Sequence, residues 1–226
     1  MLKKSWIFML PVLAGGMLPL NAEILADLQI EGSGTVTNRI SGGVSVKLQG
    51  NVPTGSPIGE STSLNFAKAA TGPTAYLELT GIGNPRSFSG SCALRIDRGD
   101  TIGVLLYRRN KQNMWQFYIA PKGGRCHLFF TAWYYDAEAK KYQVSVELAS
   151  PEPLPLKSPV RVGFRFDPDG DAALLVDGRE VASAKPERPV VWGESDIRIG
   201  GDGARRGLTA EIGEIRFGTG NDGLNL

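Results

Sequence analysis

The sequence is poor in the residues that most often carry metal binding and acid-base catalysis. His127 is its only histidine, and Cys92 and Cys126 are its only cysteines. No set of histidines and cysteines therefore has the spacing of a zinc site. A lone histidine inside an apolar run more often has a structural role than a catalytic one. This shortage argues against zinc-dependent and histidine-dependent enzymes.

The sequence also lacks an excess of charge of either sign. The chain holds 25 Lys and Arg residues against 23 Asp and Glu residues, and the first 22 residues contain two lysines and no acid. The chain beyond residue 22 therefore has 23 charged side chains of each sign. A neutral chain produces no long-range field that would attract nucleic acid or an anionic lipid surface. We expect no nucleic-acid partner.

Long apolar runs are confined to the N-terminus. Two lysines precede an apolar stretch over residues 6–20, which Pro11 interrupts, and Ala22 offers a small residue at a cleavage point. This is the three-part pattern of a secretory signal peptide. The stretch is short for a bilayer span, so a retained membrane anchor is the weaker interpretation. We predict a signal peptide at 1–22, a secreted protein in the periplasm or outside the cell, and no membrane insertion after the signal is removed.

The two cysteines leave two interpretations open. Export would place Cys92 and Cys126 in an oxidising compartment, where a disulfide would stabilise the fold by about 3–4 kcal/mol. Two buried thiols that never meet are the alternative, because sequence spacing cannot show that two Cβ atoms face each other. Cys92 and Cys126 are therefore a candidate disulfide.

Beyond the leader, apolar residues alternate with polar ones at a period of two. The clearest example is Tyr-Gln-Val-Ser-Val-Glu-Leu at 142–148, and no segment keeps a helical period for more than a turn or two. Runs of the same character, bounded by turn residues, occupy 44–48, 76–79, 92–96, 102–107, 114–120, 126–135, 162–166, 172–176, 179–182, 197–201 and 211–217. Many short strands without crossover helices predict an all-β fold, a two-sheet antiparallel jelly-roll sandwich, with 23–226 as a single domain.

Two connections between these strands have distinctive residues. Asp177-Gly178 is typical of a type I′ hairpin, because both positions tolerate a positive φ. Alternate prolines at 151, 153 and 155 cannot donate hydrogen bonds to a sheet ladder. We interpret that segment as a crossing between the two sheets.

Several strand motifs, in this order along the chain, resemble those of a known superfamily. Leu-Val-Asp-Gly at 175–178 resembles the "YVDG" hairpin of laminin G-like domains, and Ile-Arg-Ile-Gly-Gly at 197–201 resembles the "IGG" strand that follows it there. The segment 210–217 is similar to the terminal "GxIDEVRIY" strand, with Gly213 where Asp is usual, and 63–66 with 76–79 look like the early "ALxFDG…YVxL" pair. The resemblance is to laminin G-like domains of the concanavalin A-like lectin-glucanase superfamily. It implies a jelly roll of two curved sheets, export, and binding of carbohydrate or protein, sometimes with calcium.

Two arrangements of residues test an enzymatic interpretation. Glucanases on this fold place three acids at i, i+2 and i+4 of one strand, so that all face one groove. The only candidate, 211–215, has an acid at the first of these positions alone, and Glu214 is expected on the opposite side. Lyases on this fold use a Tyr, His, Arg and Gln set, and Tyr118, His127, Arg125 and Gln116 lie on one predicted hairpin. A polysaccharide-cleaving enzyme, hydrolase or lyase, therefore stays an alternative.

An Asp-rich turn is the candidate calcium site. Asp167, Asp169 and Asp171 alternate along the chain, and carboxylate oxygens suit a hard cation. The same residues are also those that turns select, and a hairpin turn is expected at this place. We therefore expect no certain cofactor and keep calcium as a weak candidate.

Aromatic residues near loops are the candidate carbohydrate site. Sugar-binding modules stack pyranose faces on exposed aromatic rings and bind hydroxyls with polar side chains. Trp133, Tyr135 and Trp192, with Arg109 on a polar loop, fit that role, while packing in the core is the alternative for the aromatics. We predict an exported, non-catalytic binding module for carbohydrate, with a cell-surface protein-interaction or structural domain as a further alternative.

Overall fold

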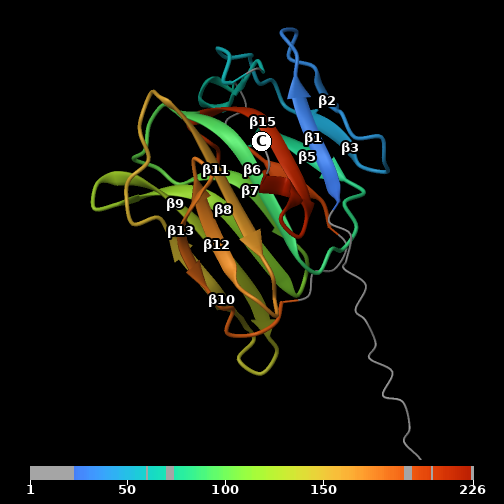
Figure 1. Ribbon diagram of the computed structural model, residues 1–226, viewed down its shortest axis with the longest axis vertical. Helices are drawn as coiled ribbons and strands as arrows, with labels where there is room; N and C mark the ends of the chain where they lie inside the picture. Colours follow the sequence, from blue (N-terminus) through green and yellow to red (C-terminus); the bar gives the residue numbers. More distant parts are fainter. Residues whose placement is uncertain (1–22, 60, 70–73, 191–194, 205, 225–226) are drawn as a thin grey trace, which may run out of the picture.

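Two antiparallel sheets form a sandwich (Figure 1). The computed structural model describes residues 23–59, 61–69, 74–190, 195–204 and 206–224. The eight-stranded sheet has the order β13 (Arg179–Ala184), β12 (Ala172–Val176), β11 (Pro159–Phe166), β6 (Phe88–Ile96), β15 (Ala210–Thr219), β1 (Ile24–Ile30) and β2 (Val36–Asn38), with β4 (Leu64–Asn65) also paired to β15. The seven-stranded sheet has the order β10 (Lys141–Ala149), β9 (Arg125–Asp136), β8 (Asn113–Lys122), β7 (Gly103–Arg109), β14 (Ile197–Ile199), β5 (Tyr76–Thr80) and β3 (Ser45–Gln49). The all-β, two-sheet prediction is confirmed.

The predicted strands correspond to twelve of the observed ones, and the connections agree as well. The helical elements of the described residues are short 3₁₀ turns at η1 (Phe66–Lys68) and η3 (Asp222–Leu224). Asp177 and Gly178 have φ values of 47° and 75°, as a type I′ turn requires. The proline-rich segment after β10 leads from the seven-stranded sheet to β11 of the other sheet, so the predicted crossing is confirmed. None of the helices described is long and apolar enough to cross a membrane.

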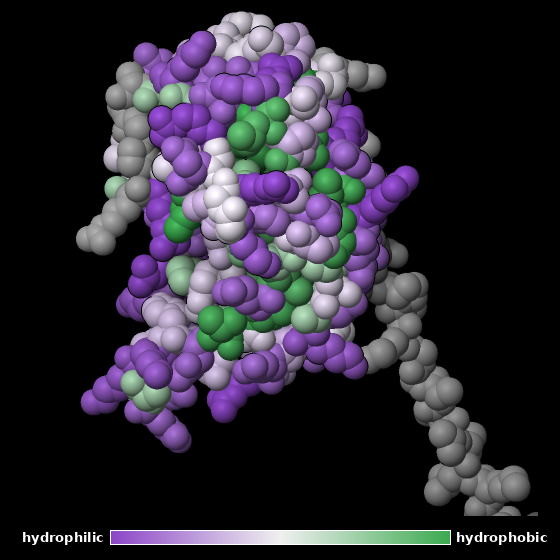
Figure 2. All heavy atoms as spheres, turned by 90° about the vertical axis from the view of Figure 1, so that its left-hand side faces the viewer, coloured by the Kyte–Doolittle hydropathy of each residue, from purple (hydrophilic) through white to green (hydrophobic). Residues whose placement is uncertain are grey.

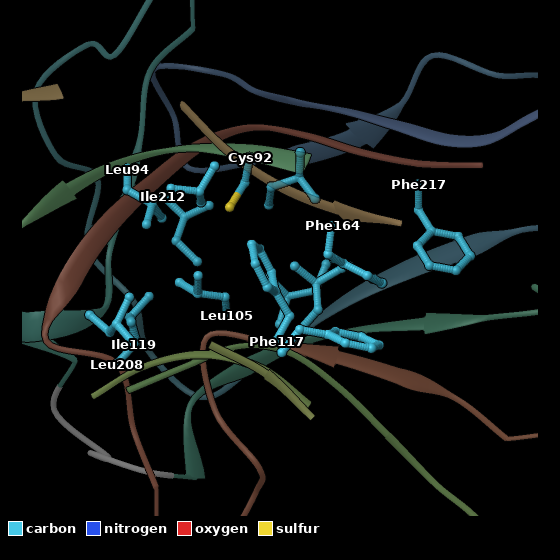
Figure 3. Close-up of a cluster of buried hydrophobic side chains, with 14 of the residues drawn as sticks. Cys92, Leu94, Leu105, Phe117, Ile119, Phe164, Leu208, Ile212 and Phe217 are labelled. Atoms are coloured by element: carbon cyan, nitrogen blue, oxygen red, sulfur yellow. The ribbon is translucent and has the colours of Figure 1, made fainter. Parts of the chain in front are cut away.

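Aromatic side chains fill the space between the sheets (Figure 3). Phe164 of β11 lies 4.9 Å from both Phe117 and Phe130 and 5.3 Å from Trp115, measured between ring centroids. Phe88 of β6 packs 5.2 Å from the Trp115 ring. Each of these side chains is fully buried, which favours the folded state by about 1.5–3 kcal/mol per large apolar side chain. The alternation of inward residues from both sheets thus produces one continuous core.

Of the two interpretations of the cysteines, the structure has the one with two separate buried thiols. Cys92 lies in β6 and Cys126 in β9, and both are buried free thiols. The two strands belong to opposite sheets, and a Cβ on Gly99 would collide with Cys126, which therefore packs against that loop. The Cys92 sulfur points into the apolar cluster (Figure 3). Burial raises the pKa of both thiols, that of Cys126 to about 11.

The start of β1, the first described strand, lies beside the end of β15, the last one. The Glu23 N–H donates to Thr219 Oγ1 at 2.8 Å, and the Thr219 N–H donates to the Glu23 carbonyl at 2.8 Å. β1 then pairs with β15 from Ile24 to Leu28. The predicted signal peptide, 1–22, lies outside the described residues.

Candidate binding site

A polar cavity lies against the outer face of the seven-stranded sheet, where the end of β7 meets the start of β14. Tyr107 and Arg109 of β7 point to this outer face. Arg108, which lies between them, points inward and pairs with Trp115 of β8 and Ile197 of β14. The cavity has a volume of about 660 Å³. It is lined by Tyr107, Arg109, Ser195, Asp196, Arg198, Asp202 and Ala204. That volume is within the range of about 300–1,000 Å³ typical of small-molecule sites.

Arg198 forms one wall of the cavity and is held from three sides. In the sheet it is the cross-strand neighbour of Tyr107 on β7 and of Glu78 on β5. Its guanidinium carbon lies 4.8 Å from the centre of the Tyr76 ring, and its Nε lies 3.8 Å from Glu78 Oε1. Its Nη1 donates to the backbone carbonyl of Asp202 at 2.8 Å. These contacts fix the direction of the guanidinium before any ligand arrives.

The loop after β14 closes another side of the cavity. Asp202 Oδ1 accepts hydrogen bonds from the N–H groups of Ala204 at 2.9 Å and Arg206 at 3.0 Å. Arg206 Nη1 donates to Gln116 Oε1 of β8 at 3.1 Å, which ties the loop to the sheet. Gln116 is only 2% exposed although it faces outward, and among the described residues its Nε2 has no hydrogen-bond partner. The outer face is therefore hollowed and polar at this point.

A buried arginine positions the segment that precedes β14. Arg108 is 1% exposed, its Nε donates to Ser195 Oγ at 2.9 Å, and its Nη2 donates to the Gly83 carbonyl at 2.5 Å. Burial lowers the pKa of Arg108, and the negative charge of Asp196 opposes that effect. Arg108 thus holds Ser195 and Asp196 at the mouth of the cavity.

Two tyrosines and Arg109 form an aromatic rim beside the cavity. The Arg109 guanidinium lies over the Tyr142 ring, 5.5 Å from its centre, and the Tyr142 ring meets Tyr135 edge-on at 5.5 Å. The Tyr142 hydroxyl donates to the Lys111 carbonyl at 3.2 Å, which fixes its ring. Tyr135 is 41% exposed, an unusual value for a large aromatic side chain. The rim therefore offers an apolar ring surface next to charged hydrogen-bonding groups.

The residues predicted from the sequence fall in different places. Arg109 lines the cavity, and Tyr135 joins it through Tyr142. Trp133 is partly buried between its cross-strand neighbours Met114 and Val144, outside the lining of the cavity. Trp192 lies outside the described residues.

Several cavity residues were missed by the sequence analysis. They are Tyr107, Ser195, Asp196 and Arg198 of the lining, and Tyr142 of the rim beside it. Tyr107 and Arg198 alternate with core residues in their strands, which is a signal for an outward position. Only the order of strands in the sheet, however, shows that these outward positions are neighbours.

The three carboxylates of the Asp-rich turn, Asp167, Asp169 and Asp171, do not converge on one point. Asp171 Oδ2 accepts from Arg165 Nη2 at 2.9 Å, Asp169 pairs with Arg86, and Asp167 Oδ1 accepts the Asp169 N–H. Each carboxylate therefore has a different partner. Within the described ranges no three acidic, histidine or cysteine side chains are grouped for a metal ion. The arrangement favours the turn over a calcium site.

Glu214 lies where the sequence analysis did not expect it. The pairing of β15 with β6 shifts between Gly213 and Ile215, so Glu214, with φ of 45°, occupies a β-bulge. The extra residue brings its carboxylate to the same outer face as Glu211, which corrects the opposite-side prediction. Glu211 pairs with Arg95, and Glu214 pairs with Arg161, both at 2.9 Å. The two acids are thus engaged in ion pairs.

The hairpin of β8 and β9 does place Tyr118, Gln116 and His127 on one face of the sheet. His127 is 6% exposed, and its Nδ1 lies 2.9 Å from the Ser150 carbonyl. The Tyr118 hydroxyl lies 3.3 Å from Thr131 Oγ1, and burial is the main cause that raises its pKa. A buried histidine bound to a backbone carbonyl is poorly placed to exchange protons with a substrate.

Comparisons with known proteins bear on the fold. No family model and no curated protein matches the sequence. The solved structures it resembles include the binding domain of botulinum neurotoxin DC in complex with SialylT, at 12% identity and a TM-score of 0.62 over 86% of this chain and 47% of that one. Another is domain 4 of a GH43 extracellular arabinanase from Geobacillus stearothermophilus in complex with arabinotriose, at 13% identity and a TM-score of 0.62 over 88% of this chain and 93% of that one.

A third likeness is to the binding domain of botulinum neurotoxin serotype G, at 10% identity and a TM-score of 0.61 over 86% of this chain. The chain spans about half the length of these toxin domains. At such low identity, the likeness establishes a shared β-sandwich fold.

Proposed function

We propose that this chain is an exported, non-catalytic binding module whose ligand is a carbohydrate. The observation that carries the proposal is the polar cavity beside an exposed aromatic rim. A sugar ring has an apolar face and a circle of hydroxyls, so its site needs an aromatic surface and hydrogen-bonding groups together. The cavity brings both within one part of the outer sheet face.

Each part of the site has a role in this proposal. The rings of Tyr135 and Tyr142 receive the apolar face of a sugar at the rim. Asp196 and Asp202 accept hydrogen bonds from sugar hydroxyls, and Arg198 donates to them. Because the Arg198 side chain is already held by its neighbours, little conformational entropy is lost when the ligand binds.

The fold comparisons support a binding role. Two of the similar structures are complexes, one with SialylT and one with arabinotriose. Another similar structure is the receptor binding domain of botulinum neurotoxin D. A polysaccharide-cleaving activity has less support, because Glu211 and Glu214 are paired with arginines and His127 is bound to a backbone carbonyl.

A protein-interaction role predicts a broad apolar surface. Figure 2 shows the side of the molecule that carries β9, β10 and β13 at the left of Figure 1, and its apolar residues form separate patches between polar ones. That face therefore lacks the continuous apolar area typical of a stable protein interface.

A polysaccharide panel tests the carbohydrate proposal. The purified protein is screened against a glycan array and insoluble polysaccharides, and Tyr142→Ala and Tyr135→Ala are measured beside it. Losing a stacking ring is expected to weaken binding about tenfold, since such contacts contribute on the order of 1 kcal/mol or more. Leu156→Ala is the matched control, because Leu156 is also exposed but does not line the cavity.

Thermal unfolding of each variant separates lost binding from lost folding. Binding that survives both tyrosine substitutions would place the ligand elsewhere. If no glycan binds, the carbohydrate proposal is wrong, and protein partners become the next class to test.

A further inference from the structure

The two arginines of the cavity wall differ in how their charges are balanced. This difference bears on the chemistry of the ligand, and the inference drawn from it rests on the proposed carbohydrate function. Arg198 lies beside the Glu78 carboxylate and also donates to the Asp202 carbonyl. Its positive charge is therefore largely offset by the protein itself.

Arg109 is exposed, and its neighbours are aromatic rather than acidic. It lies over the Tyr142 ring, and the hydroxyls of Tyr142 and Tyr107 interact with it. Those two interactions raise the pKa of Arg109, so the side chain is charged at every physiological pH. No carboxylate of the described residues lies within 4.0 Å of its guanidinium nitrogens, the distance of an ion pair.

The two aspartates of the cavity do not balance Arg109. Asp202 Oδ1 accepts two backbone N–H groups of its own loop, which hold that oxygen away from Arg109. The negative charge of Asp196 raises the pKa of Arg108 against the effect of burial, and Arg108 is buried behind the cavity. In the described part of the chain, neither aspartate forms an ion pair with Arg109.

We propose that the glycan bound in this cavity carries a carboxylate group, as uronic acids and other sugar acids do, and that Arg109 pairs with it. A guanidinium is planar and offers two parallel N–H groups, which match the two oxygens of a carboxylate. Packing over Tyr142 limits the freedom of the Arg109 side chain, which lines the cavity. A neutral sugar would leave this charge without its best partner.

Pairs of polymers that differ in the carboxylate alone test this assignment. The full-length protein, as purified, is titrated with polygalacturonate, hyaluronan and alginate, each beside its carboxyl-reduced form, and with dextran sulfate. Binding to at least one acidic polymer is expected to be tenfold or more tighter than to its reduced form, because a charge-assisted pair is lost on reduction. Added salt is expected to weaken only the acidic interaction.

Arg109→Gln is expected to bind the acidic polymer as weakly as the wild type binds the reduced one. Arg109→Lys keeps the charge but not the fork, so an intermediate affinity is expected. Arg179→Gln is the control for net charge, because Arg179 is exposed on β13 of the other sheet.

Equal affinity for acidic and reduced polymers, or an unchanged Arg109→Gln variant, overturns the assignment and leaves the carbohydrate proposal intact. A preference for dextran sulfate that depends on Arg109 would overturn the carboxylate assignment and show that Arg109 binds a sulfate group instead. Binding to none of the acidic or neutral polymers removes the proposed function together with this inference.

Discussion

At the scale of single residues, buried charges in this protein are held by fixed partners. Asp27 of β1 is 7% exposed and accepts from Arg39 Nη2 at 2.8 Å, Arg39 Nε at 3.1 Å and Arg216 Nη2 at 3.2 Å. Burial alone would raise the pKa of Asp27, but the hydrogen bonds and charges of the two arginines outweigh burial and hold it below its usual value. The ionised form is therefore the one that the fold stabilises.

This arrangement predicts an acid-dependent loss of stability. Because the pKa of Asp27 is lower in the folded state, its contribution is complete above the unfolded value of about 4 and is lost as pH falls through the folded value. Asp27→Asn is expected to lower the free energy of unfolding by about 1–3 kcal/mol at pH 7, and the difference from wild type should shrink below about pH 4. Urea unfolding followed by tryptophan fluorescence from pH 3 to pH 7 measures it. Asp100→Asn, at an exposed position, should change little, and a difference that grows in acid would contradict the argument.

At the scale of elements, alternation of apolar and polar residues was enough to find most strands. It missed β1, because the leader beside Glu23 obscures where the alternation begins. It also missed β2, which has three residues, all half-buried, and β4, which has two, both buried. It also misplaced Glu214, because a bulge changes the parity of a strand without any signal in the residue types. The site was harder to predict, since Tyr107 and Arg198 become neighbours only through the pairing of β7 with β14.

The hairpin between β11 and β12 gives the prediction at this scale. Its three aspartates have different partners, so a calcium ion would have to break the Asp171–Arg165 and Asp169–Arg86 pairs to bind. Millimolar calcium or EDTA is expected to leave the midpoint of thermal unfolding unchanged within about 1 °C, because a ligand raises stability only when it binds the native state. A calcium-dependent rise that Asp169→Asn abolishes would show that the turn is a metal site after all. Magnesium serves as the control for a general effect of divalent ions.

At the scale of the whole molecule, one apolar cluster joins the two sheets, and no covalent link between the cysteines contributes. Cys92 lies fully inside that cluster and Cys126 at 3% exposure, on opposite sheets. Both thiols have raised pKa values because of burial, and thiolates are the reactive form. Stability therefore depends on packing between the sheets.

Reducing agent is accordingly expected to leave the unfolding midpoint unchanged. Both thiols should resist Ellman's reagent in the native protein and react fully in urea, with Cys92 reacting only as fast as the sandwich opens. Cys126→Ala isolates the Cys92 signal, and absorbance of the released thiolate gives the rate. A midpoint that falls in dithiothreitol, or fewer than two reactive thiols in urea without it, would indicate a disulfide.

The contact between Glu23 and Thr219 has a consequence for engineering. Glu23 is hydrogen-bonded to Thr219, and η3, which follows Thr219, contacts β1, so the two ends of the described chain lie at the same edge of the sandwich. A unit with adjacent ends can be spliced into a surface turn of a host protein without forcing the host strands apart. The same closeness makes a circular permutant feasible, with a short linker joining the old ends and new ends opened at the exposed Asp177-Gly178 turn.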